Sequence, residues 1–304
     1  MMSLRSALAG LVCALLLGAC GGAQPGGSSA ATMEWLPASL NSVDLLYVAN
    51  QSTVTVYSYP QGKFIQTLRG DFSSPEGACS DTSGYVWIVN SGANELIGFL
   101  HGGQFPERVL IDRGAHPRDC SVDPTTGNLA VTNGANAPGV AIYNKARGRP
   151  KIYSDANFKV YLYCSYDDKG NLFVDGQGSS SSTFELAEMA KGSQTLKRVT
   201  LNHSIVYTVG LRWDGADLAI GDGTNVDEFE ISGTKGKLKG MTPLNDDYQV
   251  FQFWIEKHTL IGAEPYAESV RYWPYPKGGQ PTKTIMDHLL LPSAATVSLA
   301  SKLH

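Results

Sequence analysis

The stretch of sequence that decides the fold is PEGACSDTSGYVWIVN, residues 75–90. Relatives of this stretch return as HPRDCSVDPTTGNLAVTN, residues 116–133, and as YLYCSYDDKGNLFVDG, residues 161–176. Each copy contains a Cys-Ser pair, an acidic turn with a glycine, and an apolar strand that ends at or beside a polar residue. Internal repetition is typical of repeat folds, so the chain is expected to form a set of similar units packed on one another.

The apolar strand of the repeat sets a period along the chain. Its copies end at Asn50, Asn90, Asn133, Gly176, Asp222 and Glu264. Successive ends are 40, 43, 43, 46 and 42 residues apart. A period in the low forties with strand and turn content is typical of a four-stranded β-propeller blade. Naming the strands of a blade A to D in chain order, we interpret this strand as B.

The strands that precede B determine how the ring closes. The segments expected to form strand A are 77–80, 119–122, 163–166, 210–213, 252–255 and 295–298. The chain therefore begins at a B strand and ends at an A strand. Pairing of these two would remove two exposed sheet edges. The sequence predicts an all-β fold, a six-bladed β-propeller with 3+1 closure between the N-terminal B-C-D strands and the C-terminal A strand.

The composition agrees with this fold and limits the partners. Charged residues make up only 17% of the chain, while glycines number 33, which suits short strands and tight turns. Only residues 184–191 (FELAEMAK) have a locally helical pattern. The net charge of −4 and the absence of Lys/Arg runs argue against nucleic acid as a partner.

The N-terminus has the pattern of a targeting segment. An apolar stretch, residues 7–17, is too short to span a bilayer comfortably and runs into Leu-Gly-Ala-Cys at 17–20. This junction resembles the lipobox of bacterial lipoproteins, in which the signal is cut before an acylated Cys. The resemblance implies a signal peptide over 1–19, lipidation of Cys20, a flexible tether over 20–43 and a single propeller over 44–304. An ordinary secretory signal, with Cys20 incidental, is the alternative.

The repeat also resembles a known group of propellers. The order P-x-G-x-x-x-D…G-x-V-W-V-x-N in residues 75–90 is similar to the NHL and YVTN-type repeats of bacterial propellers, over roughly 45–298. This resemblance implies the fold. It implies no single activity, because such repeats occur in lyases, lactonases, transferases and binding modules.

The B–C and D–A loops of a propeller open on one face, around the axial mouth, which is the default ligand site. An Asn or Asp at the end of strand B either builds the turn, by bonding to its own backbone two residues on, or contributes to a polar ring at the mouth. The candidate ligand-binding residues are Asn50, Glu76, Asn90, His116, Arg118, Asp119, Asn133, Asp175, His203, Asp222, Asp247 and Glu264.

Cys79, Cys120 and Cys164 occupy equivalent A-strand positions in three successive blades. A secreted protein favours a disulfide. Equivalent residues should, however, point in the same rotational sense, so their Cβ vectors should not converge as a disulfide requires. We therefore expect these cysteines to act as small apolar fillers near the axis, with their redox state left open.

Two functions fit these patterns. The first is a lipid-anchored, extracytoplasmic module that binds a small molecule or an envelope protein at the outer membrane or cell surface. The second is a calcium-dependent hydrolase of the gluconolactonase type, whose first ligand motif resembles Glu76-Gly77. That family's later motifs, N-D-G, P-N-G and P-D-G, are replaced here by PRDCS, YLYCS and TVGLR.

We therefore favour the binding module, a monomer that contacts the membrane only through its lipid anchor. No catalytic residue and no cofactor are assigned, and calcium is the ion to consider in the mouth because oxygen ligands suit it. The six histidines form no H-x-H or H-x-x-x-H pair, so a zinc site is not indicated.

Overall fold

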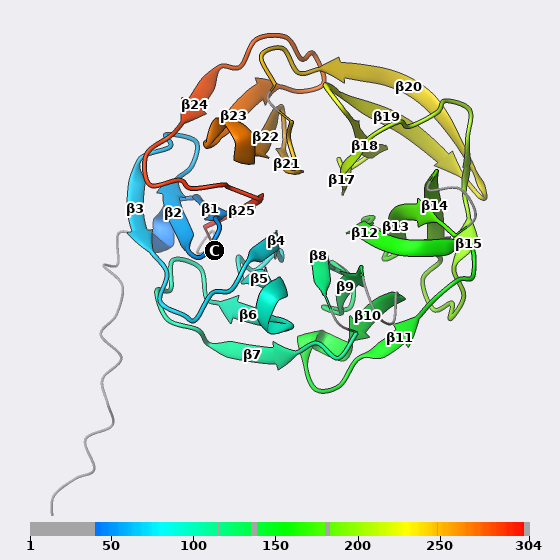
Figure 1. Cartoon of the computed structure of the whole chain (residues 1–304), viewed down its shortest axis with the longest axis horizontal. Helices are drawn as coiled ribbons and strands as arrows, with labels where there is room; N and C mark the ends of the chain where they lie inside the picture. Colours follow the sequence, from blue (N-terminus) through cyan, green and yellow to red (C-terminus); the bar gives the residue numbers. More distant parts are fainter. Residues whose placement is uncertain (1–39, 115, 135–138, 180–182, 248, 301–304) are drawn as a thin grey trace, which may run out of the picture. The chain divides into compact units, whose positions relative to one another are not determined.

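A computed structural model describes residues 40–114, 116–134, 139–179, 183–247 and 249–300. Six antiparallel sheets surround a central axis, each presenting its first strand to the axis (Figure 1). Blade 1 contains β25 (Ala294–Ser298), β1 (Leu45–Ala49), β2 (Val54–Ser58) and β3 (Phe64–Thr67). Blade 2 contains β4 (Pro75–Ser80), β5 (Val86–Asn90), β6 (Glu95–Phe99) and β7 (Arg108–Ile111). Blade 3 contains β8 (Pro117–Val122), β9 (Leu129–Asn133), β10 (Gly139–Tyr143) and β11 (Lys151–Tyr153).

The second half of the ring repeats this pattern. Blade 4 contains β12 (Phe158–Tyr166), β13 (Leu172–Gly178), β14 (Phe184–Met189) and β15 (Lys197–Arg198). Blade 5 contains β17 (Thr208–Trp213), β18 (Leu218–Asp222), β19 (Asn225–Ser232) and β20 (Lys235–Pro243), with the short β16 (Thr200–Leu201) parallel to β20 at its edge. Blade 6 contains β21 (Gln252–Glu256), β22 (Thr259–Glu264), β23 (Ser269–Pro274) and β24 (Lys283–Ile285). The predicted six-bladed propeller is confirmed.

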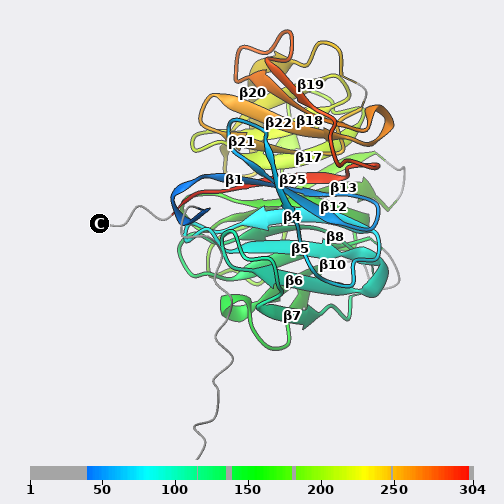
Figure 2. The ribbon, with the colours of Figure 1, turned by 90° about the vertical axis from the view of Figure 1, so that its left-hand side faces the viewer.

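The ring closes in blade 1, where the two ends of the described chain meet. Strand β1 pairs antiparallel with β25, with Leu45 opposite Ser298 and Ala49 opposite Ala294. The two strands run alongside each other in the side view (Figure 2). The predicted 3+1 closure is therefore confirmed, and no edge is left open between the first and last strands.

A histidine of blade 2 fastens this closure. The His101 ring lies 2.6 Å, through Nδ1, from the Ser298 hydroxyl at the end of β25. Its Nε2 lies 3.2 Å from the Leu40 carbonyl oxygen and 3.1 Å from that of Val43. A 3-10 turn, Leu40–Ser42, thus packs on the propeller although the sequence assigned it to the tether. Cys20 and the predicted signal peptide lie outside the described residues.

The core consists of six apolar clusters, each formed between two neighbouring blades. On β1, Leu45 and Tyr47 pack toward blade 2, while Leu46 and Val48 pack toward blade 6. Every residue of β1 is buried because blades cover both faces of the sheet. This explains why the B strands are continuously apolar instead of alternating. Each fully buried large side chain contributes about 1.5–3 kcal/mol.

Residues 184–191 do not form the helical segment that their local pattern predicted. Phe184–Met189 is strand β14, paired with β13 so that Leu172 lies opposite Met189. Leu186, Ala187 and Met189 are buried in this sheet. Helix propensity is a weak preference, and burial between blades overrides it. No helix in the described part of the chain has the length and apolarity needed to cross a membrane.

The geometric expectation that the axial cysteines would not form a disulfide was wrong for two of them, whose redox state the sequence had left open. Cys79 and Cys120 form a disulfide between β4 and β8, with their Cα atoms 5.7 Å apart. The A strands converge at the axis so closely that a Cβ on Gly77 would lie 2.5 Å from the Arg118 carbonyl oxygen. At that separation the side chains of neighbouring A strands can meet despite their common rotational sense. Cys164 is a buried free thiol.

Candidate functional site

One end of the propeller axis contains a small cavity, which we call the mouth. Its volume is about 230 Å³, and its walls are residues of three A strands and the ends of the loops that precede two others. The lining residues are Glu76, Arg118, Leu162, Tyr163, Phe251 and Ser293. They come from five of the six blades, so only closure of the ring assembles this site.

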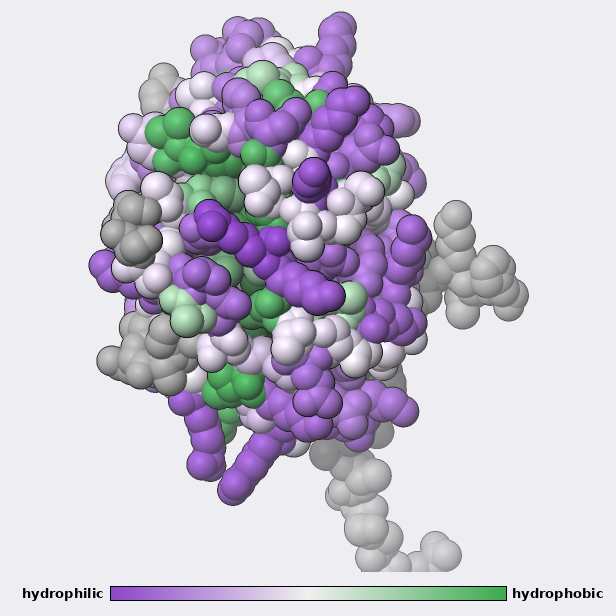
Figure 3. Space-filling view, turned by 90° about the vertical axis from the view of Figure 1, so that its right-hand side faces the viewer, coloured by the Kyte–Doolittle hydropathy of each residue, from purple (hydrophilic) through white to green (hydrophobic). Residues whose placement is uncertain are grey.

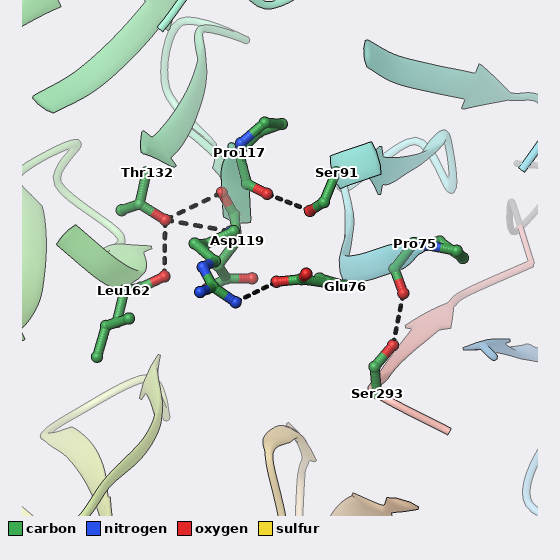
Figure 4. Close-up of polar contacts among 9 residues, drawn as sticks. Pro75, Glu76, Ser91, Pro117, Asp119, Thr132, Leu162 and Ser293 are labelled. Atoms are coloured by element: carbon green, nitrogen blue, oxygen red, sulfur yellow. Dashed lines mark hydrogen bonds and ion pairs between the residues drawn. The ribbon is translucent and has the colours of Figure 1, made fainter. Parts of the chain in front are cut away.

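An ion pair forms part of the wall of the mouth. A carboxylate oxygen of Glu76, on β4, accepts a hydrogen bond from Nη1 of Arg118, on β8. Figure 4 shows Glu76 at the centre of this set, and the Ser293 hydroxyl donating to the Pro75 carbonyl oxygen over 2.7 Å. The Arg118 Nε is buried without a hydrogen-bond partner among the described residues. The guanidinium thus has donor capacity that Glu76 does not use.

Beneath the mouth, charged and polar side chains fill the axis. We call Asp119, Arg212, Gln252 and Trp254 the central polar cluster. The Asp119 carboxylate accepts hydrogen bonds from the Gln252 side chain of β21 and from the Cys164 backbone N–H, the latter over 3.2 Å. The Arg212 guanidinium lies 4.6 Å from the centre of the Trp254 ring.

The electrostatics of this cluster follow from its burial. Burial raises the pKa of Asp119 to about 6, while the positive charge of Arg212 and three hydrogen bonds, from the Cys164 and Cys120 backbone and the Gln252 side chain, act in the opposite direction. Burial lowers the pKa of Arg212, and Asp119 partly reverses this effect. A buried carboxylate and guanidinium therefore stabilise each other across the axis.

The polar residues at the ends of the B strands bind the D–A loops of their own blades. The Asn90 side chain accepts a hydrogen bond from Ser73 N over 2.6 Å and donates one to the Asp71 carbonyl oxygen over 3.0 Å. Asp222 accepts bonds from the N–H groups of Val206 and Tyr207, over 2.8 and 2.7 Å. These partners lie in the loop before strand A. The predicted hydrogen bond to the backbone two residues after the Asn or Asp is therefore replaced by a link to another part of the blade.

At the remaining strand ends the partner lies in a D–A loop, in strand A or in strand C. Asn50 accepts from Leu290 N over 3.4 Å, and Asp175 accepts from Tyr163 N over 2.9 Å. Glu264 accepts from the Ser269 hydroxyl over 2.6 Å, and its charge helps burial to raise the pKa of Asp247 to about 7. The Asn133 side chain packs against Gly114. A Cβ atom placed on Gly114 would lie 2.6 Å from the side-chain amide of Asn133.

The predicted ligand-binding residues therefore occupy three kinds of place. Glu76 and Arg118 line the mouth, and Asp119 lies beneath it. Most of the strand-end side chains are buried within the blades, namely Asn50, Asn90, Asn133, Asp175 and Glu264. The others belong to the D–A loops or the partly exposed end of β18, namely His116, His203, Asp222 and Asp247. Contact with a ligand stays a prediction for all twelve.

Several residues of the site were not predicted from the sequence. Tyr163, Phe251 and Ser293 line the mouth, but ordinary aromatic and hydroxyl residues carry no motif. Arg212 had a detectable signal. It stands in an A strand next to Leu211, the counterpart of the axial cysteines, and is 6% exposed. A charged residue in a strand that packs at the axis requires a buried partner.

Comparison with known proteins concerns the fold. No protein-family model matches the chain, and no curated protein matches it. A chain from the crystal structure of a nidogen/laminin complex superposes with a TM-score of 0.68 at 11% identity, covering 84% of this chain and 99% of that chain. A protein of unknown function from Bacteroides caccae gives 0.59 at 13% identity, covering 84% and 99%. Kuenenia stuttgartiensis hydrazine synthase gives 0.58 at 14% identity, covering 85% and 87%.

These structures support the β-propeller and nothing finer. At 11–14% identity, a shared fold does not carry over a ligand, a partner or a reaction. The resemblance to NHL and YVTN-type repeats stays a prediction from the sequence.

Proposed function

We propose that this protein is a lipid-anchored, extracytoplasmic binding module of the bacterial envelope, which takes up a small anionic ligand at its mouth. The observation that carries the proposal is the arginine in the wall of the cavity. Arg118 bonds Glu76 through Nη1, and its Nε is buried without a partner among the described residues. A guanidinium presents five donors in a planar fork that matches carboxylate and phosphate groups.

The size and lining of the mouth limit which ligands can bind there. Its volume of about 230 Å³ is below the roughly 300–1,000 Å³ typical of pockets for drug-sized molecules. Tyr163 and Phe251 supply aromatic surface beside the charge. A small molecule with one carboxylate or phosphate and a short apolar part fits this chemistry. Such a ligand would replace Glu76 on Arg118.

The anchor rests on the lipobox-like junction that ends at Cys20. Two or more acyl chains hold a protein at a membrane durably, since each buried methylene contributes about 0.8 kcal/mol. Metabolic labelling with a palmitate analogue tests this part in a bacterial host. We expect label on the wild-type chain and none on Cys20→Ser, and equal labelling of both would refute the anchor.

The ion pair also bears on the hydrolase alternative. Glu76 is the residue that the gluconolactonase resemblance assigns to calcium, and here it is paired with Arg118. A guanidinium beside a metal ligand competes with the cation for the carboxylate. The mouth lining includes no second carboxylate among the described residues. The geometry therefore favours binding over calcium-dependent hydrolysis.

Calorimetric titration with acetate, succinate, benzoate and inorganic phosphate tests the mouth. We expect at least one of these to bind the wild type and to lose tenfold or more in affinity with Arg118→Ala. Glu76→Gln should bind more tightly, because it removes the competing charge. Arg108→Ala is the matched control, since Arg108 also pairs with a glutamate, Glu107, but lies on an outer strand. Equal binding by wild type and Arg118→Ala, or no binding of any probe, would refute this ligand class.

A further inference from the structure

A second group of ligand atoms lies on blade 5, away from the lining of the mouth. His203, Asp222 and Asp227 each offer one atom, and these atoms all lie within 4.8 Å of one another. His203 belongs to the loop between β16 and β17, Asp222 ends β18, and Asp227 lies on β19. Among the described residues, this is the one group of three His, Cys, Asp or Glu side chains with such a geometry.

The carboxylate of Asp227 is the unusual member of this group. Its side chain is 0% exposed, and neither oxygen has a hydrogen-bond partner among the described residues. The His203 imidazole lies beside it, with Nε2 3.5 Å from Oδ2. A buried carboxylate is normally hydrogen-bonded, paired or bound to a metal, because desolvation of an isolated charge is very unfavourable. Among the described residues, the Asp227 carboxylate therefore has the His203 imidazole beside it but accepts no hydrogen bond.

The second carboxylate is held in a fixed orientation. One oxygen of Asp222 accepts the N–H groups of both Val206 and Tyr207. These bonds occupy two of the roughly four lone-pair positions of a carboxylate. Hydrogen bonds of this kind orient the carboxylates that bind metals and hold the ligand in place before the ion arrives.

We propose that His203, Asp222 and Asp227 bind a divalent first-row transition metal ion, with Zn²⁺ as the preferred ion. An imidazole with two carboxylates suits such ions, whereas Mg²⁺ and Ca²⁺ prefer sites made of oxygen alone. Two ligands bound at about 2.1 Å in tetrahedral geometry lie about 3.4 Å apart. The 3.5 Å between His203 and Asp227 matches this separation.

Three protein ligands leave a fourth position of a tetrahedral ion open, as in catalytic zinc sites. A cavity of about 240 Å³ adjoins the site, and its lining includes His203, Ser204 and the Glu185–Arg198 ion pair. Figure 3 shows the side of the molecule on which blades 4 and 5 lie, where hydrophilic residues predominate. The open position would thus be available to water or to a polar ligand.

Two variants test the site on untagged protein that has been stripped of metal. Asp227→Asn keeps the shape of the buried side chain and removes its charge, and His203→Ala changes a side chain that is 40% exposed. We expect the wild type to bind one Zn²⁺ per chain by elemental mass spectrometry after dialysis. A hundredfold excess over the dissociation constant should raise its Tm by about 5 °C. Both variants should lose the bound ion and the shift.

His258→Ala is the matched control, because His258 is an exposed histidine in the turn between β21 and β22. It should bind Zn²⁺ as the wild type does. Asp227→Asn should also melt at the same or a higher temperature than the metal-free wild type, since a neutral amide replaces a buried carboxylate that accepts no hydrogen bond. That readout shows that the variant is folded. Zn²⁺ binding by Asp227→Asn and His203→Ala at wild-type stoichiometry, or no binding by the wild type, would overturn the proposal.

Discussion

The Asp119 carboxylate on β8 accepts a hydrogen bond from the Gln252 side chain on β21, which belongs to the blade on the opposite side of the ring. The same Gln252 amide donates to the Ala78 carbonyl oxygen of β4 over 3.3 Å. Through this side chain the A strand of blade 6 is joined across the axis to the neighbouring A strands of blades 2 and 3. The apolar clusters join neighbouring blades only, so this polar link stabilises the ring in a way that they do not.

The raised pKa of Asp119 predicts a pH dependence of stability. The folded pKa of about 6 exceeds the ordinary value of 3.8, so the folded protein holds this proton more tightly than the unfolded chain. The associated stability is complete below pH 3.8 and is lost as the pH rises to about 6. We expect this group to lower the free energy of unfolding by about 3 kcal/mol across that interval. Urea unfolding of the wild type and Asp119→Asn from pH 4 to 7 measures the difference.

In Asp119→Asn, this component of the slope should be absent. The exposed Asp287→Asn serves as the control and should retain the wild-type dependence. A slope in Asp119→Asn equal to that of the wild type would show that Asp119 does not titrate in this interval.

The link across the axis predicts a large effect of a single glutamine. Gln252→Leu removes a donor to the buried Asp119 carboxylate and to a buried backbone carbonyl group. We expect a loss of about 1.5–3 kcal/mol in the free energy of unfolding at pH 7, typical of hydrogen bonds to charged groups. The loss should shrink at pH 4, where Asp119 is neutral. Gln51→Leu, at an exposed position, should change stability little; an equally small change for Gln252→Leu would contradict the role assigned to the link.

The disulfide between Cys79 and Cys120 closes a loop with a sequence separation of 41. The chain-entropy model gives about 4 kcal/mol of stabilisation for a loop of this length. Paired replacement of both residues by Ala should lower the free energy of unfolding by an amount near this value in chemical denaturation. Cys164→Ala, which removes a buried free thiol, is the comparison. Peptide mapping without reduction should recover the 79–120 pair, and its absence would disprove the link.

Removing a strand-end side chain should loosen the loop that this side chain binds. Asn90→Ala removes the side chain that binds the loop residues Asp71 and Ser73. The Ser73 N–H loses this partner on an exposed loop, and a typical hydrogen bond of this kind contributes about 0.5–1.5 kcal/mol. Amide hydrogen exchange should quicken in residues 71–75, beside the mouth, more than elsewhere. Asn157→Ala, at an exposed position, should leave exchange in 71–75 unchanged. Exchange in 71–75 as slow in Asn90→Ala as in the wild type would contradict the loop link.

Most of the fold was predictable from the internal repeats of the sequence. The regular spacing from Asn50 to Glu264 located all six B strands. The chain begins at a B strand and ends at an A strand, and this identified the closure. These inferences succeeded because a blade that must bury both faces needs an apolar strand at every repeat. The segment 184–191 misled, because its helix-forming residues are held in β14 by pairing on one side with β13 and on the other with β15.

The site was predictable only in part. Loop topology predicted Glu76 and Arg118 near one end of the axis, and both line the cavity there, near the starts of β4 and β8. It could not show that these two side chains pair, or that Asn90 and Glu264 turn inward to bind loops and neighbouring residues. Such choices depend on distances of a few ångströms between residues that are far apart in the sequence.

The sequence by itself determined the number of blades, the strand order and the point of closure, since each follows from local periodicity and the count of strands. Tertiary structure alone decided which side chains meet at the axis. The approach of β4 to β8 beside Gly77 joined Cys79 to Cys120, and the ring placed Gln252 against Asp119. The physical reason is that the A strands of all blades converge at the axis. Side chains at equivalent positions come close together there, and small differences in their size and charge determine which of them make contact.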